Sequence, residues 1–201
     1  STVLLEALCR VRDRLPADGL RAIHVHHGLH ADADDWASHC VALCVRLGVP
    51  LRVLRADARP GPGESPEARA REVRYAALAA ALAADETLLT AHHADDQLET
   101  VLIQLLRGAG VAGLAAMPAA ASFGPGRHLR PLLGFTRAEL AGWAGSQGLS
   151  GWIEDPGNEE LRYARNHLRS EVLPALRAHW PGAAAAVGRS ARHCAEASRL
   201  L

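Results

Sequence analysis

Short apolar runs alternate with longer helical segments over the first two-thirds of the chain, and this alternation constrains the fold more than any other feature. The strand-like runs fall at residues 20–26, 51–54, 87–90 and 128–133. Such an alternation is typical of βαβ units, in which helices cover both faces of a mostly parallel sheet. We therefore predict an α/β fold with a Rossmann-like, doubly wound, mostly parallel sheet.

Helical periodicity fills the spaces between these strands. Ser65 and Pro66 have the residue types preferred at an N-cap and at the first helical position, and Thr136 is a second candidate cap. A Gly/Ala-rich stretch, Gly108–Gly126, is predicted to be a loop. The predicted helices are 2–15, 34–47, 66–84, one within 90–110, 136–147, 166–178 and 182–201.

These patterns divide the chain into residues 1–147, a nucleotide-binding α/β domain, and residues 148–201, a loop with a helical appendage. The sequence opens inside a helix at Ser1, with no strand or glycine-rich loop before it. A doubly wound nucleotide-binding fold normally begins with strand, glycine-rich loop and helix. We therefore expect a strand and most of such a loop upstream of Ser1.

Composition limits the class of protein. The 201 residues have a formal charge of zero, so no overall positive field attracts nucleic acid, and all 22 basic residues are arginine. The four cysteines lack a second Cys/His pair at zinc-ligand spacing, which favours free thiols in a reducing compartment. Because the sequence shows no signal peptide and no apolar span of membrane length, we predict a cytoplasmic protein that does not enter a membrane.

A polar run, TAHHADDQLET (Thr90–Thr100), opens the most apolar helix. His92, Asp96 and Glu99 are spaced to share one face of a helix, while Leu98 and Val101 would hold the opposite face against a sheet. Acidic residues also stabilise the first turn of any helix, so a purely structural role remains an alternative. We favour a site for metal, phosphate or amine chemistry at this strand-to-helix junction.

Several separated motifs resemble those of one family. IHVHHGL (23–29), RYAAL (74–78), TAHHADDQLET, LLRGAG (105–110), RPLL (130–133), WIEDPGN (152–158) and RNHLR (165–169) occur in the same order as in the bacterial tRNA(Ile)-lysidine synthetases. These enzymes belong to the PP-loop ATP pyrophosphatase superfamily, whose SGGxDS loop cradles phosphates. Ser1 resembles the last serine of that loop.

The resemblance implies an AMP-forming carbon–nitrogen ligase. Its substrates would be ATP with Mg²⁺, free L-lysine and the tRNA(Ile) with a CAU anticodon. The enzyme would adenylate the wobble cytidine, and the lysine amine would then replace AMP at carbon 2 to form lysidine. Magnesium would be held through ATP and the loop aspartate expected upstream, rather than by protein ligands in this sequence.

The resemblance also implies roles for individual residues. The role of Asp95, as a ligand-binding or a structural residue, stays open, as does that of His24. The predicted catalytic residues are His92, Asp96, Glu99, Asn158, Arg165 and Arg169. Lysine binding is assigned to Asp96, Glu99 and Arg169, and ATP binding to Ser1, His26, His27, Gly28, Arg71 and Arg74.

Three other functions are weighed against this one. A tRNA cytidine thiolase would need a Cys-x-x-Cys pair, which the sequence lacks. A metal-dependent phosphoesterase would use the histidines and aspartates of 92–96 as ligands, and a nucleotide-binding module would lack catalysis. Whether the protein is a homodimer is left open, and a predicted tRNA-binding patch comprises Arg162, Arg165, Arg169, Arg177, Arg189 and Arg192.

Overall fold

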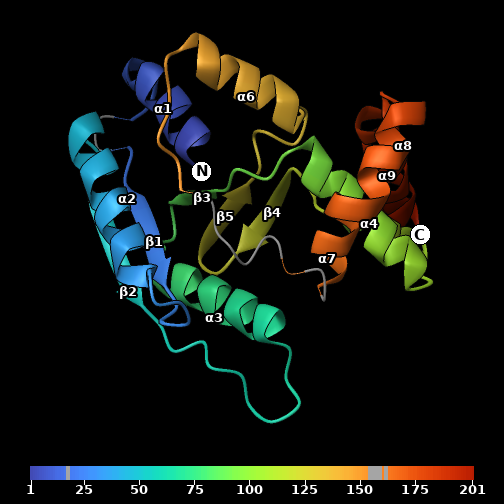
Figure 1. Ribbon diagram of the computed structural model, residues 1–201, viewed down its shortest axis with the longest axis horizontal. Coiled ribbons are helices and arrows are strands. Elements are labelled where there is room, and N and C mark those ends of the chain that lie inside the picture. Colours follow the sequence, from blue (N-terminus) through green and yellow to red (C-terminus); the bar gives the residue numbers. More distant parts are fainter. Residues whose placement is uncertain (17–18, 154–159, 161–162) are drawn as a thin grey trace. The chain divides into compact units, whose positions relative to one another are not determined.

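The computed structural model describes residues 1–16, 19–153, 160 and 163–201, and it confirms the α/β class (Figure 1). The described residues divide into two compact units. Unit 1 comprises residues 1–3, 89–121 and 128–201, and unit 2 comprises residues 4–88 and 122–127. None of the helices in the described part of the chain is both long and apolar enough to cross a membrane.

Unit 2 is built on a parallel strand pair. Strands β1 (Ala22–His26) and β2 (Leu51–Arg55) pair from Ala22 opposite Leu51 to His26 opposite Arg55. Helix α2 (Ala33–Leu47) is the crossover between them and ends at Gly48, which has a left-handed φ of 62°. This βαβ unit is the arrangement that the sequence predicts. Helix α1 (Thr2–Arg10), a 3₁₀ turn at Arg12–Arg14 and helix α3 (Pro66–Ala80) complete the helices of this part of the chain.

The predicted cap of α3 is confirmed. The Ser65 hydroxyl accepts a hydrogen bond from the Ala68 amide at 3.4 Å, and Pro66 is the first helical residue. The helix ends at Ala80, before the predicted end at Ala84.

The second sheet has the strand order β3-β5-β4, with β3 at Thr87–Leu89, β4 at Ala120–Phe123 and β5 at Gly126–Leu129. The Glu86 carbonyl accepts from the Arg127 amide, and the Leu129 carbonyl accepts from the Thr90 amide. The residue numbers on the two strands increase in the same direction along the pair, so β3 and β5 are parallel. Strand β4 joins β5 through a tight hairpin.

The prediction for this region was wrong in two respects. Residues 108–126 were predicted to be a loop, but they contain a short helix, α5 (Val111–Leu114), and strand β4. The sequence of β4, Ala-Ala-Ser-Phe, has little strand propensity, and its strand conformation depends on pairing with β5. The predicted strand 128–133 instead begins at Gly126 and ends at Leu129.

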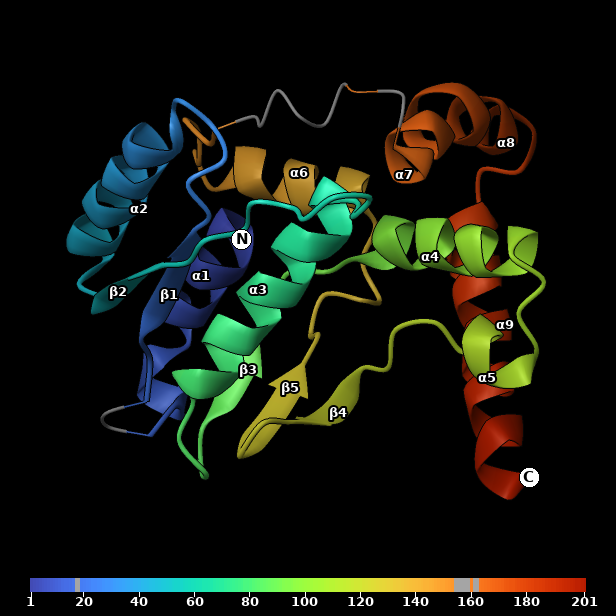
Figure 2. The same cartoon turned by 90° about the horizontal axis from the view of Figure 1, so that it is seen from below.

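Unit 1 has a helical core centred on α4 (Ala94–Leu106) and α9 (Ala183–Leu200), which lie against each other (Figure 2). Leu98 and Leu173 are fully buried, and they pack with Ala94, Ala183 and Ala184. The apolar side of α4 therefore packs against other helices and not against a sheet, contrary to the prediction. The small alanines of α9 allow this close approach, and they could not be recognised as a packing surface from the sequence.

The predicted helix 166–178 consists of three segments: α7 (Ala164–His167), a π-helical turn η3 (Leu168–Val172) and α8 (Leu173–His179). Pro174 has no amide hydrogen, and in a regular α-helix its ring would clash with the carbonyl four residues earlier. A π-helical turn just before the proline relieves this conflict. Arg169 lies in that turn. Helix α6 (Arg137–Ser146) begins after Thr136, whose hydroxyl accepts from the Glu139 amide at 3.2 Å, so this predicted cap is also confirmed.

Candidate active site on helix α4

The polar run begins before helix α4, and not inside it as the sequence had predicted. Helix α4 starts at Ala94, with His93 as its N-cap residue, so His92 precedes the helix and does not share a helical face with Asp96 and Glu99. The Asp96 carboxylate accepts a hydrogen bond from the His93 amide at 2.9 Å, which satisfies one exposed amide of the helix end. His92 is instead hydrogen-bonded through Nδ1 to the Thr90 hydroxyl at 2.8 Å. The same hydroxyl lies 2.7 Å from Nε2 of His128 on β5.

Glu99 is the centre of the site. Its side chain is 1% exposed, and its two oxygens accept hydrogen bonds from Nε and Nη2 of Arg169 at 2.8 and 2.9 Å. This bidentate pairing raises the pKa of the Arg169 guanidinium further above its already high value. A second arginine, Arg165, places Nε 3.5 Å from Glu99 and donates to the Thr100 hydroxyl at 3.2 Å. The structure thus brings three predicted catalytic residues together.

Asp96 lies at the edge of this cluster, and one of its carboxylate oxygens has no short hydrogen bond among the described residues. One carboxylate oxygen accepts the His93 amide, and the other is 3.5 Å from Nη2 of Arg169, too far for a strong hydrogen bond. The Asp96 side chain is 15% exposed, so it remains accessible to a ligand. Asp96 can therefore bind a cation in addition to its present contacts.

Asp95 is the residue whose importance the sequence did not reveal. It is 6% exposed, and it accepts from the Arg177 guanidinium at 2.6 Å and from the Arg137 amide at 2.6 Å. The Nδ1 atom of His93 lies 3.6 Å from the same carboxylate. Arg177 is 82 residues away in the chain, a distance at which no sequence period signals a pairing.

Three arginines of the predicted tRNA-binding patch pair with carboxylates. Arg165 and Arg169 turn toward Glu99, and Arg177 turns toward Asp95, so these three arginines neutralise buried carboxylates of their own unit. Arg189 and Arg192 are exposed on α9. Arg162 lies outside the described residues, as does the predicted catalytic residue Asn158.

Five of the predicted ATP-binding residues belong to unit 2. His26 is buried at the end of β1, with Nε2 3.2 Å from the Asp34 carboxylate, and His27 and Gly28 follow it. Gly28 has a φ of 68°, a conformation that glycine adopts without strain. Ser1 precedes α1 in an exposed position and belongs to unit 1.

His24 on β1 and His27, which follows the strand, share an electrostatic environment. Burial lowers the pKa of both His24 and His27, and the positive charge of Arg74 on α3 lowers it further. Neutral imidazoles are therefore favoured at this strand end, which suits hydrogen bonding to a nucleoside. Nδ1 of His27 is buried without a hydrogen-bond partner among the described residues.

Arg71 and Arg74 lie on one helix but have different surroundings. The guanidinium of Arg71 lies over the Tyr75 ring, 4.9 Å from its centre, beside a hollow of about 310 Å³ lined by Ala68, Arg71, Glu72 and Tyr75. The charge of Arg74 instead contributes to lowering the pKa of His24 and of His27. Arg74 is thereby linked to His27, another predicted ATP-binding residue.

The metal-dependent alternative has no support from the geometry. Among residues 1–16, 19–153, 160 and 163–201, no group of three or more histidine, cysteine or acidic side chains is arranged to hold a metal ion. Asp95 and Glu99 are neutralised by arginine side chains, and the Asp96 carboxylate contacts the His93 amide. The arrangement suits amine or phosphate chemistry better than metal binding.

Comparison with known proteins identifies the family of the chain. The sequence matches the PP-loop domain family over residues 1–176. The tRNA(Ile)-lysidine synthase of Methylococcus capsulatus is 54% identical over all 201 residues, and that of Pseudomonas aeruginosa is 51% identical. The chain covers 45% of each of these proteins, so it spans less than half the length of the curated relatives that it matches.

A solved structure supports the fold. The U34-tRNA thiolase NcsA from Methanococcus maripaludis, determined with its [4Fe-4S] cluster, superposes with a TM-score of 0.78. The superposition covers 98% of this chain and 68% of that chain at 17% sequence identity. The two proteins share a fold, and at this identity the similarity says nothing about the reaction.

Proposed function

We propose a function for this chain, which belongs to the PP-loop domain family. It forms the part of a tRNA(Ile)-lysidine synthase that adenylates the tRNA and transfers lysine to it. The observation that carries the proposal is the cluster on α4, where Asp96 and Glu99 meet Arg165 and Arg169. The names of relatives that are 54% and 51% identical over the 201 aligned residues support the same conclusion. A cytoplasmic location, alongside the tRNA substrate, follows from this activity.

The proposed reaction has two steps. The O2 atom of the wobble cytidine in tRNA(Ile) with a CAU anticodon attacks the α-phosphorus of ATP, and the bond to pyrophosphate breaks. The ε-amine of lysine then attacks carbon 2, the carbon–oxygen bond breaks and AMP leaves. The amine gives up protons in the process, so the site must first bind an ammonium group and then accept a proton from it.

The cluster on α4 meets these requirements through a division of roles. Asp96 has an oxygen available to bind the lysine ammonium and to accept its proton. Glu99 uses both oxygens to fix Arg169, whose remaining N–H groups can bind an anion such as the lysine carboxylate or the leaving phosphate. Together, Asp96, Glu99 and Arg169 form the proposed lysine site, with Arg165 as a second cation beside it.

ATP binding is assigned to unit 2 and to Ser1. Gly28 allows a close backbone approach. Burial and the charge of Arg74 lower the pKa of His27, which favours a neutral ring next to His26. Mg²⁺ would neutralise the phosphates of ATP and stabilise charge on the departing pyrophosphate. The ion would be held chiefly by ATP itself. His92 and Asn158 remain proposed catalytic residues.

A single-turnover assay tests this function. The full-length protein is mixed with a CAU-anticodon tRNA(Ile) transcript, ATP, Mg²⁺ and labelled lysine, and label in the tRNA is measured. We expect ATP-dependent incorporation that falls at least 100-fold in Asp96→Asn and in Glu99→Gln, because each change removes a charge from the amine site.

Glu139→Gln is the matched control, since Glu139 is an exposed carboxylate that caps α6 in the same unit. It should retain incorporation within about two-fold, as expected for a surface change. Incorporation that survives both site variants would refute the assignment of the lysine site. Failure of the wild-type protein to incorporate lysine would refute the proposed function.

A further inference from the structure

Asp95 joins three separate segments of unit 1. It lies in the first turn of α4, one residue before Asp96, and is 6% exposed. One oxygen accepts from Nη2 of Arg177 in the last turn of α8, and the other accepts from the Arg137 amide at the start of α6, both at 2.6 Å. A buried carboxylate with such short contacts to a cation and to a helix N-terminus is fixed in place.

The partner of Asp95 belongs to the segment that carries Arg169. Arg169 lies in the π-helical turn, and α8 continues directly from that turn to Arg177. Between them, Leu173 is fully buried against Ala94 and Leu98 of α4. The segment therefore touches α4 at three places: an ion pair at each end and an apolar contact between them.

The two ion pairs limit how the segment from Arg169 to Arg177 can move over α4. The apolar contact at Leu173 is not directional, so on its own it would let the segment rotate over α4. The Arg169–Glu99 pair fixes one end, and the Arg177–Asp95 pair fixes the other. With both ends held, the guanidinium of Arg169 is kept within reach of Asp96 and Glu99 as a ligand exchanges at the site.

We propose that Asp95 and Arg177 are a positioning pair, which sets the place of Arg169 at the lysine site without touching the substrate. The proposal rests on the proposed function. The charge of Asp95 also acts directly on Arg169, since it adds to the effects of Glu99 and Asp96 that raise the pKa of that guanidinium. Loss of the pair should weaken the use of lysine while leaving the use of ATP unchanged, because most of the proposed ATP-binding residues belong to unit 2.

A double-mutant cycle tests this in the full-length protein, with lysine and ATP varied separately. The variants are Asp95→Asn, which keeps an acceptor for the Arg137 amide, Arg177→Met, and the two combined. We expect kcat/KM for lysine to fall by about ten-fold or more in each single variant, with KM for ATP within about two-fold. The double variant should be no worse than either single variant, because the two residues act as one unit. Arg177→Lys, which keeps a cation, should recover part of the loss.

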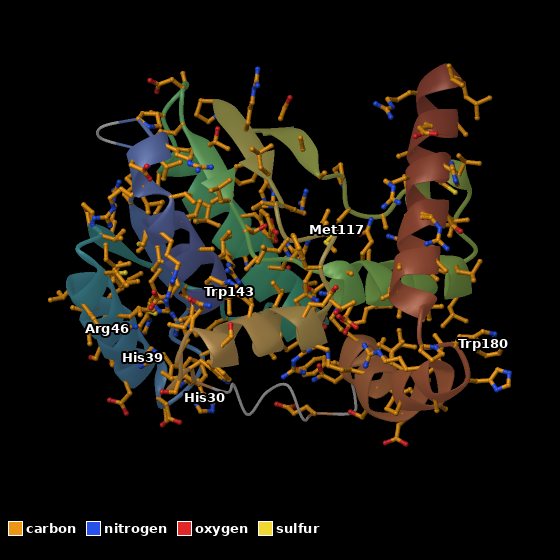
Figure 3. The ribbon with its side chains drawn as sticks, turned by 90° about the horizontal axis from the view of Figure 1, so that it is seen from above. His30, His39, Arg46, Met117, Trp143 and Trp180 are labelled. Atoms are coloured by element: carbon orange, nitrogen blue, oxygen red, sulfur yellow. The ribbon has the colours of Figure 1, made fainter. Side chains whose placement is uncertain are left out.

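A matched control separates positioning from general stability. Glu6, which is also 6% exposed, pairs with Arg46 at 2.9 Å in unit 2. Arg46 lies on α2 (Figure 3). Glu6→Gln and Arg46→Met should lower the melting temperature to a similar degree without changing KM for lysine. If the variants of Asp95 and Arg177 lower only the melting temperature, the pair is structural and the proposal is wrong. If wild-type protein fails to incorporate lysine while ATP binding persists, the proposed function fails instead, which is a separate result.

Discussion

Both carboxylate oxygens of Glu99 accept hydrogen bonds from the guanidinium group of Arg169, at 2.8 and 2.9 Å. The two residues are 70 positions apart in the chain, and the glutamate is 1% exposed. A carboxylate this deeply buried is tolerated only because a cation and its hydrogen bonds replace the lost water. The same pair therefore stabilises unit 1 and shapes the proposed lysine site.

Arg169→Met is predicted to lower the free energy of unfolding by about 3 kcal/mol, because it leaves the buried Glu99 charge without its strongest partner. Urea unfolding at pH 7 measures the loss. The double variant Glu99→Gln/Arg169→Met should recover at least half of it, because it also removes the buried charge. A double variant less stable than Arg169→Met would show that an unpaired charge is not the cause.

Gly126→Ala is predicted to destabilise the protein by about 2 kcal/mol or more, as overpacking does in well-packed regions. A Cβ atom at this position would lie 2.2 Å from the Glu86 carbonyl oxygen, on the backbone of the segment that pairs with β5. Gly142→Ala on α6 is the matched control, because a Cβ there meets open space. The control should be neutral or stabilising by about 0.5–1 kcal/mol, since alanine favours a helix interior. Equal effects of the two changes on the urea midpoint would contradict the steric argument.

Acid should weaken the contact between Arg21 and Glu86. Nε of Arg21 donates to Glu86 at 2.7 Å, and this hydrogen bond, together with one from the Ala83 amide, lowers the pKa of Glu86 from 4.5 to about 2. A carboxylate whose pKa is lower in the folded state contributes stability above its unfolded pKa, and this contribution is lost as the pH falls from about 4.5 toward 2. Wild-type protein should therefore lose more stability between pH 5 and pH 3 (roughly this window) than Glu86→Gln, in which the contribution is already absent. Parallel pH dependences of the two proteins in urea unfolding would argue against the contact.

The elements that the sequence predicted well are those set by local signals. The βαβ unit of β1, α2 and β2 follows from hydrophobic periodicity, and the starts of α3 and α6 follow from Ser65 and Thr136 as capping residues. The errors fall where the structure depends on distant partners. Strand β4 forms because β5 lies beside it, and α4 packs on α9 because Ala183 and Ala184 leave room.

The site shows the same division. The polar run identified Asp96 and Glu99 as neighbours on one helix, because their spacing of three residues is a local property. That Arg177 pairs with Asp95 could not be predicted, since 82 residues separate the two. His92 was wrongly placed inside the helix because a histidine, His93, occupies the N-cap position, where serine, threonine, aspartate or asparagine is the usual signal.

The last prediction concerns the charge of His24 and His27 at the proposed nucleotide site. Burial lowers the pKa of His24 and His27 below the ordinary value of 6.5, and Arg74 adds to the effect. NMR titration of the ring protons should give midpoints below 6.5 for both. Arg74→Ala should raise both midpoints only in part, because burial is the larger cause and the variant retains it.

The lowered pKa of these histidines also makes the stability of the fold depend on pH. Because the folded state disfavours the protonated rings, their contribution to stability is present above pH 6.5 and declines as the pH falls below it. Neutral rings at pH 7 would also bind ATP by hydrogen bonding and not by charge, so ATP affinity in wild-type protein should change little between about pH 7 and 8. Midpoints at or above 6.5 in the wild-type protein would show that these histidines are more hydrated than their surroundings indicate, and would remove this argument for their contact with adenosine.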